Sequence, residues 1–172
     1  DDFYDFDIFE QNIDFNKFEN IVKNWVSIQD YINLNNKINF LKTHNGNFTI
    51  NDFPFTNTAN TAGGIYIVRD PRDVVLSYSK FSGLNIDDVI KIIKDEKFTV
   101  KNKESQYFTH WSRWDYHVSS WLIPNYPKIV IKYEDMIDKP MQTIMQLIMF
   151  LKSVGVEGVF TDQKILNVMK ST

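Results

Sequence analysis

The feature that most constrains the fold of this chain is an apolar run that ends in a cluster of charges. Residues 64–68, "GIYIV", are apolar or small and rich in β-branched side chains, which is typical of a strand buried on both faces of a parallel sheet. The charged stretch "RDPRD" follows directly, at residues 69–73. An Asp before a Pro is a strong helix start, so the pattern predicts a helix that begins at Pro71.

The rest of the chain repeats this alternation of strands and helices. Apolar runs predict further strands, and apolar positions at helical spacing predict further helices. Strands that alternate with helices indicate an α/β fold, here a three-layer α/β/α sandwich with a mainly parallel sheet. In such folds ligands bind at the carboxyl ends of the strands. The additional strands are expected at 37–44 and 128–133, and the additional helices at 16–34, 85–97, 107–122, from Pro140 onward, and at 162–170.

Composition excludes several classes of function. The 172 residues contain no repeat or linker, so we expect a single domain over 1–172. With 19 basic and 22 acidic side chains the net charge is −3, which argues against general nucleic-acid binding. Cysteine is absent, which excludes disulfides and thiolate sites and suits a cytoplasmic location. No apolar run approaches the ~20 residues that span a bilayer, so we expect no membrane partner. The oligomeric state cannot be read from the sequence.

The charged cluster after the central strand has two interpretations. Helix capping accounts for Asp70, Pro71 and Asp73, which occupy the N-cap, N1 and N3 positions of a capping box. Capping does not account for Arg69, the residue that follows the strand. Its guanidinium beside the free N–H groups of a helix start would form an anion site, with the hydroxyl of Ser77 one turn further along. The alternative is a buried network between arginine and aspartate.

The end of the expected strand at 37–44 offers a candidate general base. His44 stands just past that end, and Lys42 points to the same face if the strand continues. A cation beside the imidazole favours the neutral form that a base needs. The alternative is a surface or capping histidine. His110 and His117 would lie ~10 Å apart on one straight helix, which is too far to share a metal ion.

The strand at 128–133 ends in Tyr133, which Glu134 and Asp135 follow. The acids suit helix capping and the tyrosine suits packing. The alternative is that the ring of Tyr133 forms an aromatic wall for a flat ligand.

Four stretches carry a resemblance to a known family. "FLKTH", "IYIVRDPRDVVLSYSKF", "WDYHVSSW" and "IVIKYEDMIDKP" occur in the order seen in sulfotransferases that use 3′-phosphoadenosine-5′-phosphosulfate (PAPS). The resemblance covers residues 38–172 and implies a P-loop NTPase-like α/β fold. It further implies that Arg69 and Ser77 hold the 3′-phosphate of PAPS, that His44 is the general base supported by Lys42, and that Tyr133 lies near the adenine. The acceptor would be a small molecule with a hydroxyl or amine, and no metal is required.

The sequence departs from the family pattern at both ends. The family's N-terminal loop, which resembles Pro-Lys-Ser-Gly-Thr-Thr-Trp and binds the 5′-phosphosulfate, is not found, and neither is its C-terminal Arg-Lys-Gly element. We therefore expect a partial sulfotransferase fold that belongs to a longer enzyme. Two other functions stay open at this point: a kinase-like P-loop phosphotransferase, which would need a Gly-rich loop, and a non-catalytic remnant that binds a nucleotide or a protein.

Overall fold

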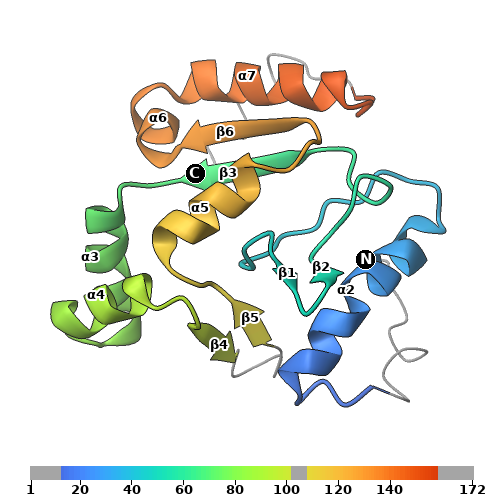
Figure 1. Ribbon diagram of the computed structural model, residues 1–172. Coiled ribbons are helices and arrows are strands. Elements are labelled where there is room, and N and C mark those ends of the chain that lie inside the picture. Colours follow the sequence, from blue (N-terminus) through green and yellow to red (C-terminus); the bar gives the residue numbers. More distant parts are fainter. Residues whose placement is uncertain (1–12, 102–107, 159–172) are drawn as a thin grey trace. The chain divides into compact units, whose positions relative to one another are not determined.

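The computed structural model describes residues 13–101 and 108–158. The chain divides into two compact units (Figure 1). The first is drawn from Asp1–Thr61 and Val75–Pro124, and the second from Ala62–Val74 and Asn125–Thr172. Within the described ranges, no helix has the length and apolar character needed to cross a membrane.

The second unit is built on two parallel strands. Strand β3 (Gly64–Val68) pairs with β6 (Lys128–Lys132), in a register that runs from Gly64 opposite Lys128 to Val68 opposite Lys132. The parallel pairing, with helices in the chain between the two strands, confirms the predicted α/β class. Because the strands are parallel, their carboxyl ends meet at one edge of the sheet.

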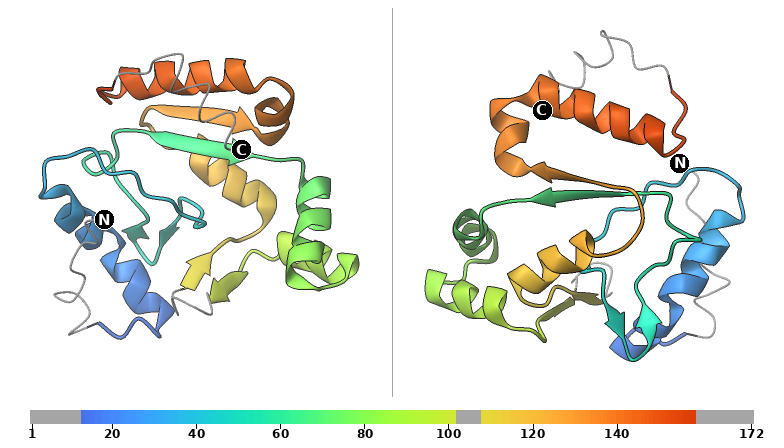
Figure 2. Two further views of the ribbon diagram at one scale, coloured as in Figure 1. Left: turned by 180° about the vertical axis from the view of Figure 1, so that it is seen from behind. Right: turned by 45° about the horizontal axis from the view of Figure 1, so that its top comes forward.

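Helices follow each of these strands without a long connection. Helix α3 (Pro71–Ser82) begins after β3, as predicted. Helix α6 (Tyr133–Asp138) begins directly after β6, so the predicted strand ends one residue early and Tyr133 is helical. Helix α7 (Pro140–Ser153) then runs alongside β6, which Figures 1 and 2 show from three directions. The side chains of Ile131 and Ile148 are buried in this unit.

The prediction that the central strand is buried on both faces is wrong. In β3, Ile65 and Ile67 are 41% and 51% exposed, and Val130 of β6 is 43% exposed. The reason is that the described parallel sheet has only two strands, with α7 beside β6. A β-branched run indicates that a strand can be buried on both faces, but the elements packed against it determine how much of it is buried.

The core of the first unit surrounds helix α2 (Phe18–Asn33). Its buried residues Ile21, Val22 and Trp25 contact aromatic rings from other segments, among them Phe55 and Phe108. Trp25 meets Phe55 edge to face, with ring centroids 5.2 Å apart. The remaining elements of the unit are the antiparallel pair β1 (Thr49–Ile50) and β2 (Phe53–Pro54), helix α4 (Ile86–Lys94), the antiparallel pair β4 (Thr99–Lys101) and β5 (Phe108–His110), and helix α5 (Trp114–Leu122).

Two sequence predictions fail in this unit. Residues 38–44 form no regular structure, and no described strand pairs with them, although a strand was predicted at 37–44. An extended apolar segment becomes a strand only when another backbone satisfies its N–H and C=O groups. The predicted helix at 107–122 begins at Trp114, because residues 108–110 pair with β4. The predicted helix at 162–170 lies outside the described residues.

Candidate functional site

The carboxyl edge of the parallel pair starts with the cap of helix α3. The Oδ1 atom of Asp70 accepts a hydrogen bond from the backbone N–H of Arg72 at 2.9 Å, which confirms Asp70 as the capping residue. The predicted capping box also requires the side chain of Asp73 to accept a hydrogen bond from the N–H of Asp70, and the structure shows a different partner for this N–H. The N–H of Asp70 donates to Oε1 of Glu134 at 3.4 Å instead, so a residue of α6 completes the cap.

Arg72 takes part in this cap. Its guanidinium donates two hydrogen bonds to the carboxylate of Asp70, from Nε to Oδ1 at 2.9 Å and from Nη2 to Oδ2 at 2.6 Å. These side-chain bonds, together with the Arg72 N–H, lower the pKa of Asp70 to about 2. The Arg72 side chain is 88% exposed. The sequence interpretation assigned Arg72 no ligand role, and the contacts with Asp70 give this residue a structural one.

Arg69 has a different environment from Arg72. Its guanidinium carbon lies 4.4 Å from the centroid of the Tyr133 ring, a cation–π distance. Its Nε is 3.9 Å from Oδ2 of Asp73, which is an ion pair but too long for a hydrogen bond. In the part of the chain that the structure describes, this buried Nε has no hydrogen-bond partner. The ion pair with Asp73 therefore leaves the Nε of Arg69 without a hydrogen bond among the described residues.

The structure brings two of the predicted ligand residues together within one unit. Arg69 and Tyr133 meet in the second unit, at the carboxyl ends of β3 and β6. Ser77 lies on α3, is exposed, and is counted with the first unit, as are Lys42 and His44.

His44 stands in the irregular segment that precedes β1. Its side chain is exposed and its ring is tilted against that of Trp111, with centroids 6.4 Å apart. Partial burial lowers the pKa of His44 below its usual value, and the charge of Lys42 lowers it further. The predicted effect of Lys42 on the imidazole is therefore present, although desolvation is the larger cause. Both effects favour the neutral ring at pH 7.

Sequence reasoning missed two residues that organise these sites. Glu134 was noted as a capping acid of its own helix, whereas its bond to the Asp70 N–H links positions 64 residues apart, which no local spacing predicts. Asn45 is buried, and its Oδ1 accepts from the N–H of His110 at 2.8 Å. The sequence shows an Asn directly after the candidate base, but its structural role becomes clear only once its hydrogen bond to His110 is known.

Among the residues that the structure describes, no group of three or more His, Cys, Asp or Glu side chains is placed to hold a metal ion.

The fold and the strand-end residues define a class of protein. Parallel strands whose carboxyl ends lie beside a helix N-terminus are typical of α/β domains that bind ligands at that edge of the sheet. The family model described as "Sulfotransferase domain" matches residues 9–171. The chain therefore belongs to the sulfotransferase family, and the resemblance seen over residues 38–172 is confirmed. A search of curated proteins found no match to the chain.

Proposed function

We propose that this protein transfers a sulfuryl group from PAPS to a hydroxyl or amine of a small-molecule acceptor, in the cytoplasm. The family supports sulfuryl transfer in general. The choice of PAPS rests on the four sequence stretches described above. The observation that carries the residue assignment is the buried Nε of Arg69, which lacks a hydrogen-bond partner among the described residues.

Arg69 fits the 3′-phosphate of PAPS by its chemistry. A buried guanidinium N–H without a partner is costly, and an anionic oxygen is a strong acceptor for it. About a third of the Arg69 side chain is exposed, so a ligand can approach the guanidinium group, while the Nε itself is buried. The backbone N–H groups at the start of α3 supply further positive potential on the same side. Ser77, on the same helix and exposed, offers a hydroxyl as a second donor.

Tyr133 fits the adenine in the same proposal. Tyr133 is 37% exposed, while the guanidinium carbon of Arg69 lies over its ring, 4.4 Å from the centroid. An exposed aromatic surface beside a phosphate-binding cation suits a flat purine ring.

His44 suits the role of general base. PAPS supplies an activated sulfuryl group, and the acceptor oxygen or nitrogen forms a new bond to sulfur as the bond from sulfur to the 5′-phosphate oxygen breaks. The acceptor loses its proton to the neutral imidazole of His44, and 3′-phosphoadenosine-5′-phosphate (PAP) leaves. Proton removal of this kind contributes about 10²- to 10⁴-fold in rate. Lys42 would stabilise negative charge on the leaving oxygen.

Binding of PAP tests the nucleotide assignment without knowledge of the acceptor. We expect calorimetric titration to show binding to the wild type and a loss of about tenfold or more in Arg69→Ala, because a charged hydrogen bond contributes about 1.5–3 kcal/mol. The matched control is Arg72→Ala, which removes an exposed arginine three positions along and should change the affinity less than twofold. Unchanged affinity in Arg69→Ala would return this residue to a structural role.

A parallel titration with ATP and Mg²⁺ separates the proposal from a kinase-like phosphotransferase. We expect PAP to bind more tightly than ATP, since ATP lacks the 3′-phosphate. If neither nucleotide binds, a non-catalytic domain becomes the better description.

A further inference from the structure

We propose that helix α5 is a positioning element for His44 and that Ser120 is its central positioning residue. The inference deepens the proposed function, because it rests on His44 acting as the base. It concerns only residues of the first unit. His44 lies outside any strand, so the hydrogen bonds of a sheet do not hold its backbone.

Three side chains of α5 hydrogen-bond to the backbone at residues 44–47. The Nε2–H of His117 donates to the carbonyl of His44 at 3.3 Å, and the Nε1–H of Trp121 donates to the carbonyl of Asn45 at 3.1 Å. The hydroxyl of Ser120 accepts from the N–H of Asn47 at 2.9 Å. Positions 117, 120 and 121 have the i, i+3, i+4 spacing of one helix face. One face of α5 therefore holds the segment that carries His44.

Strand β5 holds the same segment through His110. The N–H of Gly46 donates to the carbonyl of His110 at 3.0 Å, and the N–H of His110 donates to Oδ1 of Asn45 at 2.8 Å. Asn45 and Gly46 are buried, whereas the side chain of His44 is exposed. The backbone beside His44 is thus fixed while its imidazole stays accessible to an acceptor.

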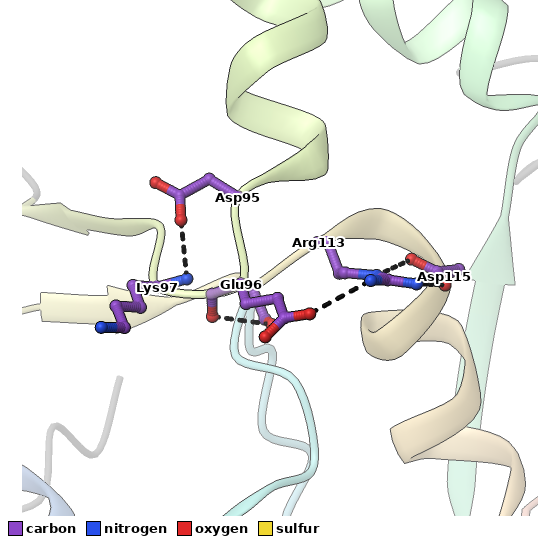
Figure 3. Close-up of polar contacts among 6 residues, drawn as sticks. Asp95, Glu96, Lys97, Arg113 and Asp115 are labelled. Atoms are coloured by element: carbon purple, nitrogen blue, oxygen red, sulfur yellow. Dashed lines mark hydrogen bonds and ion pairs between the residues drawn. The ribbon is translucent and has the colours of Figure 1, made fainter.

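The start of α5 is itself fixed to the loop before β4, as Figure 3 shows. Arg113, the residue before the helix, donates to Oε1 of Glu96 at 3.1 Å and to both carboxylate oxygens of Asp115 at 2.7 and 2.6 Å. The hydroxyl of Ser112 donates to the carbonyl of Glu96 at 2.9 Å. The helix face that contacts residues 44–47 is therefore anchored at its amino end.

The charges around His44 agree with this role. Burial lowers the pKa of His117. The hydrogen bond to the His44 carbonyl raises this pKa in part, and the charges of His44 and His110 lower it. The net shift is downward, so this ring is neutral at pH 7 and keeps one N–H to donate. Partial burial and, to a lesser extent, the charge of Lys42 lower the pKa of His44 itself. If α5 packs less closely against residues 44–47, the His44 ring should become more hydrated, and its pKa should change.

Ser120 offers a test with a matched control on the same helix. Its hydroxyl joins α5 to Asn47 and also donates to the carbonyl of His117 at 2.7 Å. The neighbouring Ser119 is exposed and donates to the carbonyl of Asp115 at 2.8 Å, a bond within the helix. Both substitutions, Ser120→Ala and Ser119→Ala, remove one hydroxyl and one intrahelical bond. Only Ser120→Ala removes the bond to the segment beside His44.

The experiment combines kinetics with a readout that needs no activity. We expect Ser120→Ala to lower kcat by about tenfold, since small displacements of a catalytic group are costly, with PAP affinity changed less than twofold. Ser119→Ala should match the wild type in both. In parallel, NMR titration of the ring protons, assigned with His44→Gln, should show the pKa of His44 moving toward 6.5 in Ser120→Ala alone.

The two readouts separate this inference from the proposed function. If the wild type transfers no sulfuryl group from PAPS, the proposed function fails, while the NMR comparison still decides whether α5 positions His44. If the His44 ring titrates identically in Ser119→Ala and Ser120→Ala, the positioning role of Ser120 is overturned, whatever the turnover.

Discussion

The guanidinium of Arg69 lies over the ring of Tyr133, with the guanidinium carbon 4.4 Å from the ring centroid. The contact joins the residue that follows β3 to the residue that follows β6, at the edge where the two parallel strands end. A cation over an aromatic face is held in orientation by the quadrupole of the ring. Tyr133 therefore restricts the directions in which Arg69 can present its N–H groups, in addition to its proposed contact with adenine.

This relationship predicts different effects for two substitutions at Tyr133. Tyr133→Phe keeps the aromatic face and should change PAP affinity less than twofold. Tyr133→Leu removes it and should weaken PAP binding by about two- to thirtyfold, the range of cation–π contributions. Calorimetry with adenosine 5′-phosphate, which lacks the 3′-phosphate, shows whether Tyr133 affects binding through Arg69 or through adenine. A loss seen with PAP alone indicates action through Arg69, whereas an equal loss with both ligands indicates contact with adenine.

The proposed base predicts a separation of catalysis from binding. In His44→Ala we expect turnover with PAPS to fall by about 10²-fold or more, because general-base catalysis is removed. The affinity for PAP should stay within about twofold of the wild type, because Arg69 and Ser77, not His44, are proposed to hold the 3′-phosphate. Steady-state kinetics and calorimetry on the same preparation measure both. Turnover equal to the wild type would remove His44 from the mechanism.

Lys42 predicts a shift in the pH dependence. The base must be neutral, so kcat/KM should fall as the pH drops through the pKa of His44, which lies below 6.5. Removing the neighbouring charge in Lys42→Met makes the imidazolium less costly, so its pKa rises and the acid limb moves to higher pH. The limb should remain below 6.5, because the desolvation of His44 persists.

The control for this shift is Lys37→Met, which removes a lysine from the same segment. Its acid limb should coincide with that of the wild type. The pH midpoint of the acid limb is the measurement, because the proposed role of Lys42 at the leaving oxygen also affects the maximal value of kcat/KM. An acid limb that stays in place in Lys42→Met would show that desolvation alone sets the pKa.

A stability prediction concerns the start of α4. The Oδ1 atom of Asn85 accepts from the N–H of Asp88 at 2.9 Å, which is a helix N-cap bond. Asn85→Ala should lower the free energy of unfolding by about 1 kcal/mol, and Asn85→Ser should restore most of it because Ser also caps. Urea denaturation followed by circular dichroism checks this. Equal losses in both variants would show that the side chain acts through something other than the cap.

Local features were predictable where one stretch of chain contains all the interacting groups. The start of α3 is such a case, because Asp70 and the N–H of Arg72 that it caps are two residues apart. The other half of that cap was not predictable, because Glu134 reaches the N–H of Asp70 across 64 positions. The predicted strand at 37–44 failed for a related reason. Its apolar pattern is real, but no described backbone pairs with it.

The candidate site likewise combines features that the sequence predicts with features that only the tertiary structure shows. Residue types and spacing alone identified Arg69, Ser77, Lys42, His44 and Tyr133 as candidates, because strand ends and helix starts are encoded over a few neighbouring residues. They also established the α/β class, since the period of apolar residues is a local property. Only the tertiary structure left the Nε of Arg69 buried and without a hydrogen-bond partner in the ranges 13–101 and 108–158. It also placed the guanidinium over Tyr133 and set α5 against the segment of His44. Burial, ring contacts and long-range hydrogen bonds join residues distant in sequence, so packing decided them.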